Sequence, residues 1–395
     1  MKSKAENLVP SKMQDRPTIR FYRDIDDIDR LETVWADLAA TTDQPLYFQS
    51  PIWLRHVAAI KSRGASDDWQ IYLATAWRGD RLTAIWPLSL QREGLCTIAR
   101  CLDDPIGQFA GFLADDDEDP QQAIDSIIHA LRSKGLAAGL MIERVVEGSA
   151  LHRSLAANGA KITYSDQSAV IDFRPHDSFQ SYLKTRKSKT RKNLRNARNR
   201  LERDHGVEHE IVTGSGDIRS IMDQAFEARL VWMQDQAKTA PAFRDPDFRC
   251  LLDGLPESAA GKDLIGFRLR AGDTPIAVQW GFLHAGRYYA FISARNPAFD
   301  AYSPGRLHLS MVLEACFERG VDMVELMAPA SDYKMNWTDQ ARQIDDFGLA
   351  LTASGYLYLD LWRRHGRSMA RRLYHGLPDG VRRHVAGMAN KNLAS

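Results

Sequence analysis

The chain has 395 residues, of which 44% are hydrophobic, 26% charged and 9% aromatic, and its formal net charge is +1. This length predicts two or three domains, because domains usually hold about 100–200 residues. The composition is sufficient for hydrophobic cores and excludes disordered, collagen-like and low-complexity chains. The sequence has no run of roughly 18 apolar residues and no secretory signal at its polar N-terminus. We therefore expect a cytoplasmic protein without a membrane-spanning helix.

Charge is distributed unevenly along the sequence. Residues 1–150 hold 17 Lys and Arg against 23 Asp and Glu, a net charge of −6, whereas residues 151–395 have a net charge of +7. An anionic ligand is therefore expected to bind the second half. The four cysteines have neither the spacing of a metal site nor the density of a disulfide framework. They predict buried or chemically idle thiols, and no metal site is expected.

The first half predicts helices, then a strand meander, then a strand–helix–strand unit. After a polar arm at residues 1–16, a short strand precedes a helix whose apolar residues recur at helical spacing from Ile28 to Leu38. Ser50 is a candidate N-cap for a second helix that begins at Pro51. The expected strands lie at 69–77, 82–90, 95–102, 141–145 and near 162, with helices that begin at 120 and 149.

The second half predicts the same order of elements. A strand at 168–173 leads into one long helix from Ser178 to about Arg203, and ten Lys and Arg occur between Lys184 and Arg203 against one acidic residue, Glu202. A helix is also expected to begin at Pro304, after three antiparallel strands joined by Gly-containing turns. The fold class predicted for the chain is α/β, with mixed, mostly antiparallel sheets flanked by helices. The remaining expected elements are strands at 207–212, 264–270, 276–283, 288–294, 321–326 and 344–351 and a helix at 217–236.

Four stretches of sequence carry a resemblance to a known family: FQSPIW at 48–53, the basic helix at 184–203, YSPGRL at 302–307 and DYKMNW at 332–337. They resemble the GNAT acyltransferase superfamily, and more specifically its duplicated branch of cellulose-biosynthesis-associated and Fem-like acetyltransferases. One departure is the segment Met327-Ala328-Pro329-Ala330, where the family pattern predicts a glycine.

The resemblance implies two tandem GNAT-like domains. We expect the first at residues 17–166 and the second, which holds the donor site, at residues 167–352. A basic amphipathic tail at residues 353–395 is expected to follow them.

The expected helix start near Pro304 suits the pyrophosphate of CoA, because free N–H groups and the helix dipole together favour phosphate there. Pro304 fits a first helical turn, Gly305 permits close approach of the backbone, and Arg306 adds a cation. The alternative is an ordinary capped helix start. Acyl-CoA is the expected cosubstrate, and its predicted binding residues are Arg295, Ser303, Pro304, Gly305, Arg306 and Leu307.

Candidate catalytic residues lie in and after the strand at 321–326. Glu325 is the candidate general base, because partial burial raises the pKa of a carboxyl group towards neutrality. Lys334 can hold an anionic substrate group or the oxyanion, and Tyr333 can return a proton to the thiolate. Tyr289 and Trp337 are candidate substrate-binding residues. The alternatives are a surface lysine, a core tyrosine and a glutamate that faces solvent.

Two basic segments predict an anionic partner. Residues 355–395 hold eight Lys and Arg against two Asp and include apolar residues such as Trp362, a pattern typical of an interfacial amphipathic segment. A helix packed on the domain with its basic face exposed is the alternative. The basic helix at 184–203 has no interleaved aromatic residues of the kind that stack on single strands, so no nucleic-acid partner is expected.

The predicted function is acyl-CoA-dependent transfer of an acyl group to an amine or hydroxyl of a cell-envelope acceptor. One such acceptor is a long-chain lipid amine such as a sphingoid base, which would make the reaction a ceramide-type synthesis. Two alternatives stay open: an exopolysaccharide acetyltransferase, and a non-catalytic GNAT-like module in envelope biosynthesis. The expected location is the cytoplasm, with peripheral attachment to an anionic inner membrane face in the lipid case.

Overall fold

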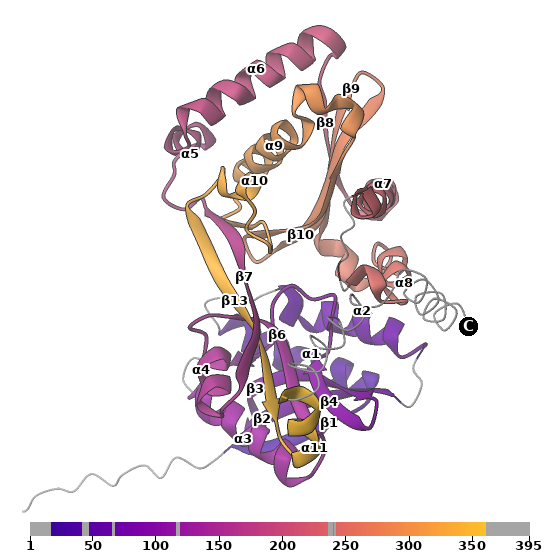
Figure 1. Ribbon diagram of the computed structural model, residues 1–395, viewed down its shortest axis with the longest axis vertical. Helices are drawn as coiled ribbons and strands as arrows, with labels where there is room; N and C mark the ends of the chain where they lie inside the picture. Colours follow the sequence, from indigo (N-terminus) through magenta and orange to yellow (C-terminus); the bar gives the residue numbers. More distant parts are fainter. Residues whose placement is uncertain are drawn as a thin grey trace, which may run out of the picture.

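Figure 1 shows the computed structural model, which describes residues 17–41, 47–64, 68–115, 119–235, 240 and 242–360. The predicted polar arm and the tail from residue 361 onward, which includes Trp362, lie outside the described residues. The described strands form one mixed sheet in the order β1-β2-β3-β4-β6-β13-β7-β12-β11-β10-β9-β8, and β5 pairs with β3. Helices flank this sheet on both faces, so the predicted α/β fold class is confirmed.

The first half of the chain folds around the strands β1 to β6. Helix α2 (Pro51–Lys61) begins at Ser50, whose hydroxyl accepts a hydrogen bond of 3.3 Å from the N–H of Trp53, as the sequence predicts. The other elements of this half are β1 (Thr18–Tyr22), α1 (Ile25–Ala40), η1 (Tyr47–Gln49), β2 (Trp69–Arg78), β3 (Arg81–Glu93), β4 (Cys96–Cys101), β5 (Leu113–Ala114), α3 (Pro120–Ser133), β6 (Gly139–Val146) and α4 (Ala150–Ala157).

Two long strands, β7 (Lys161–Asp172) and β13 (Gln340–Ala350), run from one half to the other (Figure 1). β13 pairs antiparallel with both β6 and β7, and the far end of β7 pairs with β12. The sequence predicts two separate strands here, near 162 and at 168–173. The structure has one, because β13 supplies backbone partners along almost all of β7. The predicted domain boundary at 166 and 167 falls inside β7 and stays a prediction.

The predicted long basic helix is two helices, α5 (Phe179–Thr185) and α6 (Ser188–His205). They are separated at Arg186, which is extended (ψ 155°) and whose guanidinium lies 2.9 Å from the carboxylate of Asp339. The other elements of the second half are β8 (Glu208–Thr213), α7 (Ser215–Asp235), η2 (Ala242–Arg244), α8 (Phe248–Gly254), η3 (Ala259–Asp263), β9 (Leu264–Ala271), β10 (Thr274–His284), β11 (Arg287–Arg295), η4 (Pro297–Tyr302), α9 (Pro304–Glu318), β12 (Met323–Glu325), α10 (Asp332–Met335) and α11 (Ala353–Tyr356).

Helices α7 and α9 pack on opposite faces of the sheet in the second half (Figure 1). Val312 and Leu313 of α9 pack in a core cluster with Val324 and Tyr288, whereas Ile221 of α7 belongs to a cluster on the other face. We call these the α9 face and the α7 face. Cys96, Cys101 and Cys316 are buried, whereas Cys250 of α8 is exposed.

The α7 face is also where the two halves meet, through an aromatic cluster. The ring of Tyr47, from the first half, stacks on Phe282 of β10 with centroids 4.1 Å apart, and Phe48 contacts Tyr289 of β11 edge-to-face at 5.8 Å. None of these four rings is more than 1% exposed, so the contact is as closely packed as a domain core. The strands β10 and β11 are therefore held against the first half.

Candidate functional site

The strands β11 and β12 separate shortly after they meet. They pair in parallel only where Arg287 to Tyr289 lies opposite Met323 to Glu325. β11 then continues to Arg295, whereas the chain after β12 turns towards β7, where the N–H of Leu326 donates to the carbonyl of Ala169 at 2.9 Å. Beyond Tyr289, β11 has no strand partner on this side among the described residues. Its backbone groups there can pair with an extended ligand.

Helix α9 begins beside the far end of β11, at the residue that the sequence predicts. Pro304 is its first residue, and Ser303 before it is in the left-handed region with φ 52°. The helix has 15 residues, and no side chain caps its N-terminus. A helix start without a side-chain cap presents positive dipole ends that favour an anion.

Several of the predicted residues gather around Gly305, in the first turn of α9. The hydroxyl of Tyr333 donates a hydrogen bond of 2.8 Å to the carbonyl of Gly305. A Cβ at Gly305 would lie 3.3 Å from Cδ of Arg295, so this cation also reaches the helix start. Burial of its hydroxyl raises the pKa of Tyr333, and the nearby Arg306 and Arg295 oppose this shift. The three side chains therefore place two cations and one hydroxyl beside the start of α9.

Leu307 differs from its predicted neighbours because its side chain is 3% exposed and packs with Leu201 and Leu269 in a core cluster. Its backbone N–H donates to the carbonyl of Ser303 at 3.1 Å, so neither its side chain nor this N–H is free for a ligand. The guanidinium of Arg295 also contacts the carboxylate of Asp300, so part of its charge is already neutralised.

Glu325 is fully buried at the end of β12, between two arginines. Its Oε1 lies 3.1 Å from Arg342 and 3.4 Å from Arg287, whereas Oε2 has no hydrogen-bond partner in the described residues. Burial raises the pKa of Glu325, and the two guanidinium groups oppose this shift. A carboxylate with a raised pKa and one oxygen without a partner is suited to accept a proton.

Lys334 lies in the short helix α10, and its Nζ donates to the carbonyl of Met327 at 2.9 Å. Burial lowers the pKa of Lys334 to about 8, and the nearby Arg229 of α7 adds to this effect, whereas Asp166 opposes it. Met327 itself has φ 63°, a conformation that favours glycine. The segment that departs from the family pattern therefore keeps the backbone geometry of a glycine at Met327.

The two predicted substrate-binding residues lie on opposite faces of the sheet. Tyr289 is on the α7 face in the aromatic cluster, whereas Trp337 packs with the α9 face and is 0% exposed. The backbone carbonyl of Trp337 accepts a hydrogen bond from the hydroxyl of Tyr182. The structure therefore does not bring Tyr289 and Trp337 together, and a single substrate group cannot contact both.

Sequence reasoning missed Ser168, a fully buried serine of β7 whose Oγ has no hydrogen-bond partner in the described residues. It also missed Arg287 and Arg342, the partners of Glu325. Ser168 lies directly opposite Arg342 in the pairing of β7 with β13. No short motif connects these residues, because the pairing of strands far apart in the sequence brings them to Glu325.

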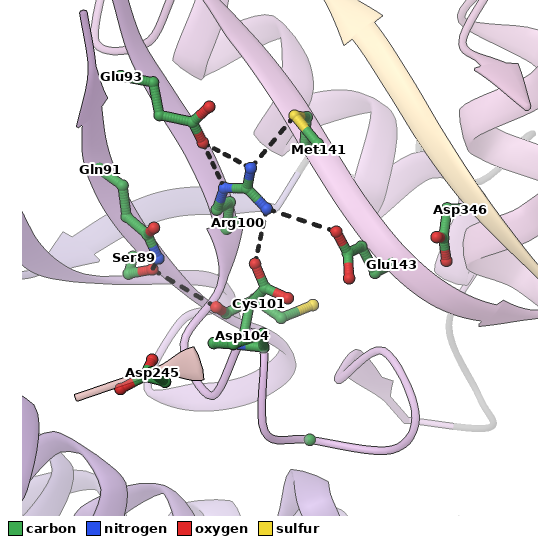
Figure 2. A network of polar contacts seen from close by, with 12 residues as sticks. Ser89, Gln91, Glu93, Arg100, Cys101, Asp104, Met141, Glu143, Asp245 and Asp346 are labelled. Carbon is green, nitrogen blue, oxygen red and sulfur yellow. Dashed lines mark hydrogen bonds and ion pairs between the residues drawn. The ribbon is translucent and has the colours of Figure 1, made fainter. Parts of the chain in front are cut away.

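A second buried charge cluster lies in the first half, around Arg100 of β4 (Figure 2). Its guanidinium lies 2.7 Å from Glu93, 2.6 Å from Asp104 and 3.6 Å from Glu143, so one cation meets three carboxylates. Burial raises the pKa of Glu143 to about 7, with Asp104 and Asp346 adding to the shift. This cluster has internal partners for its cation and holds an excess of acid. None of the described residues forms a group of three or more His, Cys, Asp or Glu placed to hold a metal ion.

Comparisons with known proteins agree with this geometry. Residues 188–335 match the model of the acetyltransferase (GNAT) domain family. The crystal structure of FemX is similar to this chain, with a TM-score of 0.59 and 12% identity over 83% of this chain and 98% of FemX. So is the C-terminal domain of a putative lysylphosphatidylglycerol synthetase from Agrobacterium fabrum, with a TM-score of 0.50 and 14% identity over 84% of this chain and 95% of that one.

A search of curated proteins finds no match. At the identities of the two solved structures, the similarity shows a shared fold, and it extends over both halves of the chain. The GNAT domain match lies within the second half of the chain. The resemblance on which the sequence analysis depends is therefore confirmed.

Proposed function

We propose that this protein, a member of the GNAT superfamily with a Fem-like fold, transfers an acyl group from acyl-CoA to an amine of a cell-envelope acceptor. The observation that carries the proposal is the separation of β11 from β12 beside the start of α9. This geometry offers backbone groups for the extended arm of a CoA thioester and a helix N-terminus for its pyrophosphate. Arg295 and Arg306 supply the countercharge.

The reacting groups are then assigned by position. The amine nitrogen attacks the thioester carbon, a C–N bond forms, and the C–S bond breaks with the electron pair leaving on sulfur. Glu325, whose pKa is raised, takes the proton that the nitrogen loses. The ammonium of Lys334 stabilises the oxyanion of the intermediate, and Tyr333, beside the donor helix, protonates the thiolate.

The acceptor class is the least constrained part of the proposal. A lipid amine, such as a sphingoid base, and a hydroxyl of an exopolysaccharide sugar are the two acceptor alternatives. The non-enzymatic alternative is a GNAT-like module that recruits envelope enzymes and catalyses no reaction itself. Only the enzyme requires that CoA bind beside α9, so CoA binding separates the two classes of function.

We further propose that the enzyme works in the cytoplasm, at an anionic membrane face when the acceptor is a lipid. The support is the exposed basic surface of α6, where Lys189, Arg191, Lys192 and Arg195 are all exposed. This helix stands at the far end of the second half (Figure 1). No helix in the described part of the chain is long and apolar enough to cross a membrane.

Calorimetric titration with CoA tests the proposed function. We expect wild type to bind CoA and Gly305→Val to bind it at least tenfold more weakly, because the added side chain meets Arg295 and blocks phosphate approach. Gly348→Val, in β13 and away from α9, is a matched control, since a Cβ at Gly348 would lie 3.5 Å from Thr163 of β7. Wild type without CoA affinity, or Gly305→Val with unchanged affinity, contradicts the donor site.

A further inference from the structure

Arg200, an exposed residue near the end of α6, lies beside the residues that lead into α9. Its guanidinium lies over the ring of Tyr302, with 5.0 Å between the guanidinium carbon and the ring centroid. Tyr302 is the last residue of η4 and comes two positions before Pro304, where α9 begins. A cation over an aromatic ring is attracted by the negative face of the ring. The contact therefore brings a positive charge close to the helix start that is proposed to hold the pyrophosphate.

Two residues of α6 fix the orientation of Tyr302. Its hydroxyl donates a hydrogen bond of 3.2 Å to the carboxylate of Asp204 and lies 3.1 Å from Nε2 of His205. Its ring also contacts the rings of His205 and Phe299, whose centroids are 5.2 Å and 6.2 Å away. A tyrosine that is held both at its ring and at its hydroxyl can rotate little. Tyr302 therefore keeps the guanidinium of Arg200 in one place.

The acidic residues of this region already have partners, whereas the guanidinium of Arg200 does not. Asp204 forms an ion pair of 2.7 Å with Arg203, and Asp300 of η4 forms one with Arg295. Among the described residues, no ion pair or hydrogen bond engages the guanidinium of Arg200. A planar guanidinium with unused donors matches the oxygen atoms of a phosphate, which it can bind with two parallel hydrogen bonds. The arrangement therefore favours a phosphate group at this place.

The proposed donor has such a phosphate in the corresponding part of its molecule. In CoA the pyrophosphate is attached to the 5′ position of a ribose, and the 3′ position of the same ribose carries a phosphate monoester. A phosphate monoester carries roughly 1.5–2 negative charges at pH 7. With the pyrophosphate at Pro304, the 3′-phosphate lies within the width of one ribose from it. Tyr302 and the guanidinium over its ring are the neighbours of the helix start at that range, since only Ser303 separates Tyr302 from Pro304.

The two ends of the donor extend in different directions from the start of α9. Tyr333 of α10 contacts the first turn at Gly305, and the free edge of β11 leads back towards Glu325, where the thioester is expected. Helix α6 instead contacts α9 and η4 (Figure 1). A donor whose thioester arm lies along β11 therefore directs its nucleotide end towards η4 and α6.

We propose that Arg200 binds the 3′-phosphate of the CoA ribose and that Tyr302 is the residue that positions it. This inference rests on the proposed function, because it requires the pyrophosphate at the start of α9. It assigns a second anion contact to the donor, at the end farthest from the reacting thioester. The contact makes the enzyme prefer CoA thioesters to thioesters of the same arm that lack this phosphate.

The test compares CoA with 3′-dephospho-CoA, which lacks only the phosphate monoester, by calorimetric titration of the full-length protein. We expect wild type to bind CoA at least tenfold more tightly than dephospho-CoA, because a charge-assisted contact is lost with the phosphate. Arg200→Ala should bind both compounds equally, with the affinity that wild type has for dephospho-CoA. Tyr302→Phe keeps the ring but loses the bonds to α6, so its preference for CoA should lie between those of wild type and Arg200→Ala.

The matched control is Arg198→Ala, which removes the same charge from another exposed residue of α6. Arg198 is two residues from Arg200, about 200° around the helix, so it points away from Tyr302 and its loss should leave the preference unchanged. Equal affinity of wild type for the two compounds, a wild-type preference in Arg200→Ala, or an equal loss in Arg198→Ala overturns the phosphate site. The first comparison needs only wild type, so it decides the matter even where a variant does not fold. Failure of the proposed function is distinct, because wild type would then bind neither compound.

Discussion

The hydroxyl of Tyr333 donates a hydrogen bond of 2.8 Å to the carbonyl of Gly305, and this bond ties the segment after β12 to the first turn of α9. Gly305 belongs to the proposed donor site, whereas Tyr333 is the proposed acid for the leaving thiolate. The two residues are 28 positions apart in the sequence. The contact therefore places the hydroxyl of Tyr333 beside the helix start that is proposed to hold the pyrophosphate.

Tyr333→Phe removes the hydroxyl and its hydrogen bond to Gly305 but keeps the packing of the aromatic ring. Loss of one hydrogen bond should lower the free energy of unfolding by about 1 kcal/mol. Loss of a proton donor to the thiolate should lower kcat by at least tenfold, since general acids typically contribute more than that. Thermal melting and thiol release measure the two effects. Tyr356→Phe, at an exposed tyrosine of α11, is the control, and equal kcat in both variants contradicts the role of Tyr333.

The residues around α9 could be predicted from the sequence because their signals are local. Pro304 and Gly305 indicate the start of α9 through their own backbone preferences. Ser50 indicates the start of α2 in the same way, as its N-cap. The break at Arg186 has no such signal. The residues on both sides of Arg186 suit a helix. Arg186 is extended in the structure and forms an ion pair with Asp339, which is far away in the sequence.

The surroundings of Glu325 could not be predicted in the same way. Ser168, Glu325 and Arg342 lie on three strands and meet only because β7 pairs with both β12 and β13. A serine in a strand of mixed polar and apolar residues is unremarkable in the sequence, and its lack of a hydrogen-bond partner among the described residues becomes visible only in the structure. The sequence likewise does not show on which face of the sheet Tyr289 and Trp337 lie. Tertiary packing decides which helix covers each face.

Lys334→Ala and Glu325→Gln test the two other assigned roles. Because the pKa of Lys334 is lowered to about 8, the rate of wild type should fall as pH rises through about 8 and the lysine loses the charge that stabilises the oxyanion. Lys334→Ala should be at least tenfold slower and should lack this fall. Glu325→Gln should lose activity at every pH, because an amide cannot take the proton.

The measurement is the pH profile of thiol release with acetyl-CoA and n-butylamine as a small amine acceptor, beside a thermal melt of each variant. Lys262→Ala, at an exposed lysine of η3, is the control. Variants that melt like wild type and keep its full activity would show that neither residue is catalytic. Should Glu325→Gln unfold, the glutamate serves mainly to balance Arg287 and Arg342.

The cluster around Arg100 predicts a dependence of stability on pH. Because the folded state raises the pKa of Glu143 from its ordinary value of 4.5 to about 7, the folded state binds this proton more tightly than the unfolded chain does. The stabilisation is complete below about pH 4.5 and is lost as pH rises through about 7. Glu143→Gln removes the titration, so it should be more stable than wild type at pH 8, by on the order of 1 kcal/mol, and closer to it at pH 5.

Urea unfolding at pH 5 and pH 8 measures this difference. The control is Glu202→Gln, at an exposed glutamate of α6. A Glu143→Gln variant that is less stable than wild type at pH 8 would show that the ionised carboxylate stabilises the fold through Arg100, at 3.6 Å, more than its burial and its acidic neighbours destabilise it.

The last prediction concerns attachment to anionic membranes. Residues 353–360 pack on the first half, where Leu359 is 7% exposed in a cluster with Cys96 and Ile98, so a truncation that spares the fold ends at residue 360. The segment removed, 361–395, holds eight Lys and Arg against one Asp. Each such cation contributes roughly 1 kcal/mol near an anionic leaflet, and salt screens this attraction. Wild type should therefore float with anionic vesicles at low salt and stay unbound with neutral ones.

Two variants divide the attraction between the tail and α6. Truncation after residue 360 should abolish flotation, and Lys189→Glu with Lys192→Glu, both exposed on α6, should weaken it. Arg63→Glu with Arg132→Glu changes the net charge equally at exposed sites of the first half and should leave flotation unchanged. If full-length protein stays at the bottom with both vesicle types, the basic segments do not attach the enzyme to lipid. A water-soluble amine then becomes the acceptor to test, because an enzyme without membrane attachment meets a lipid amine only rarely.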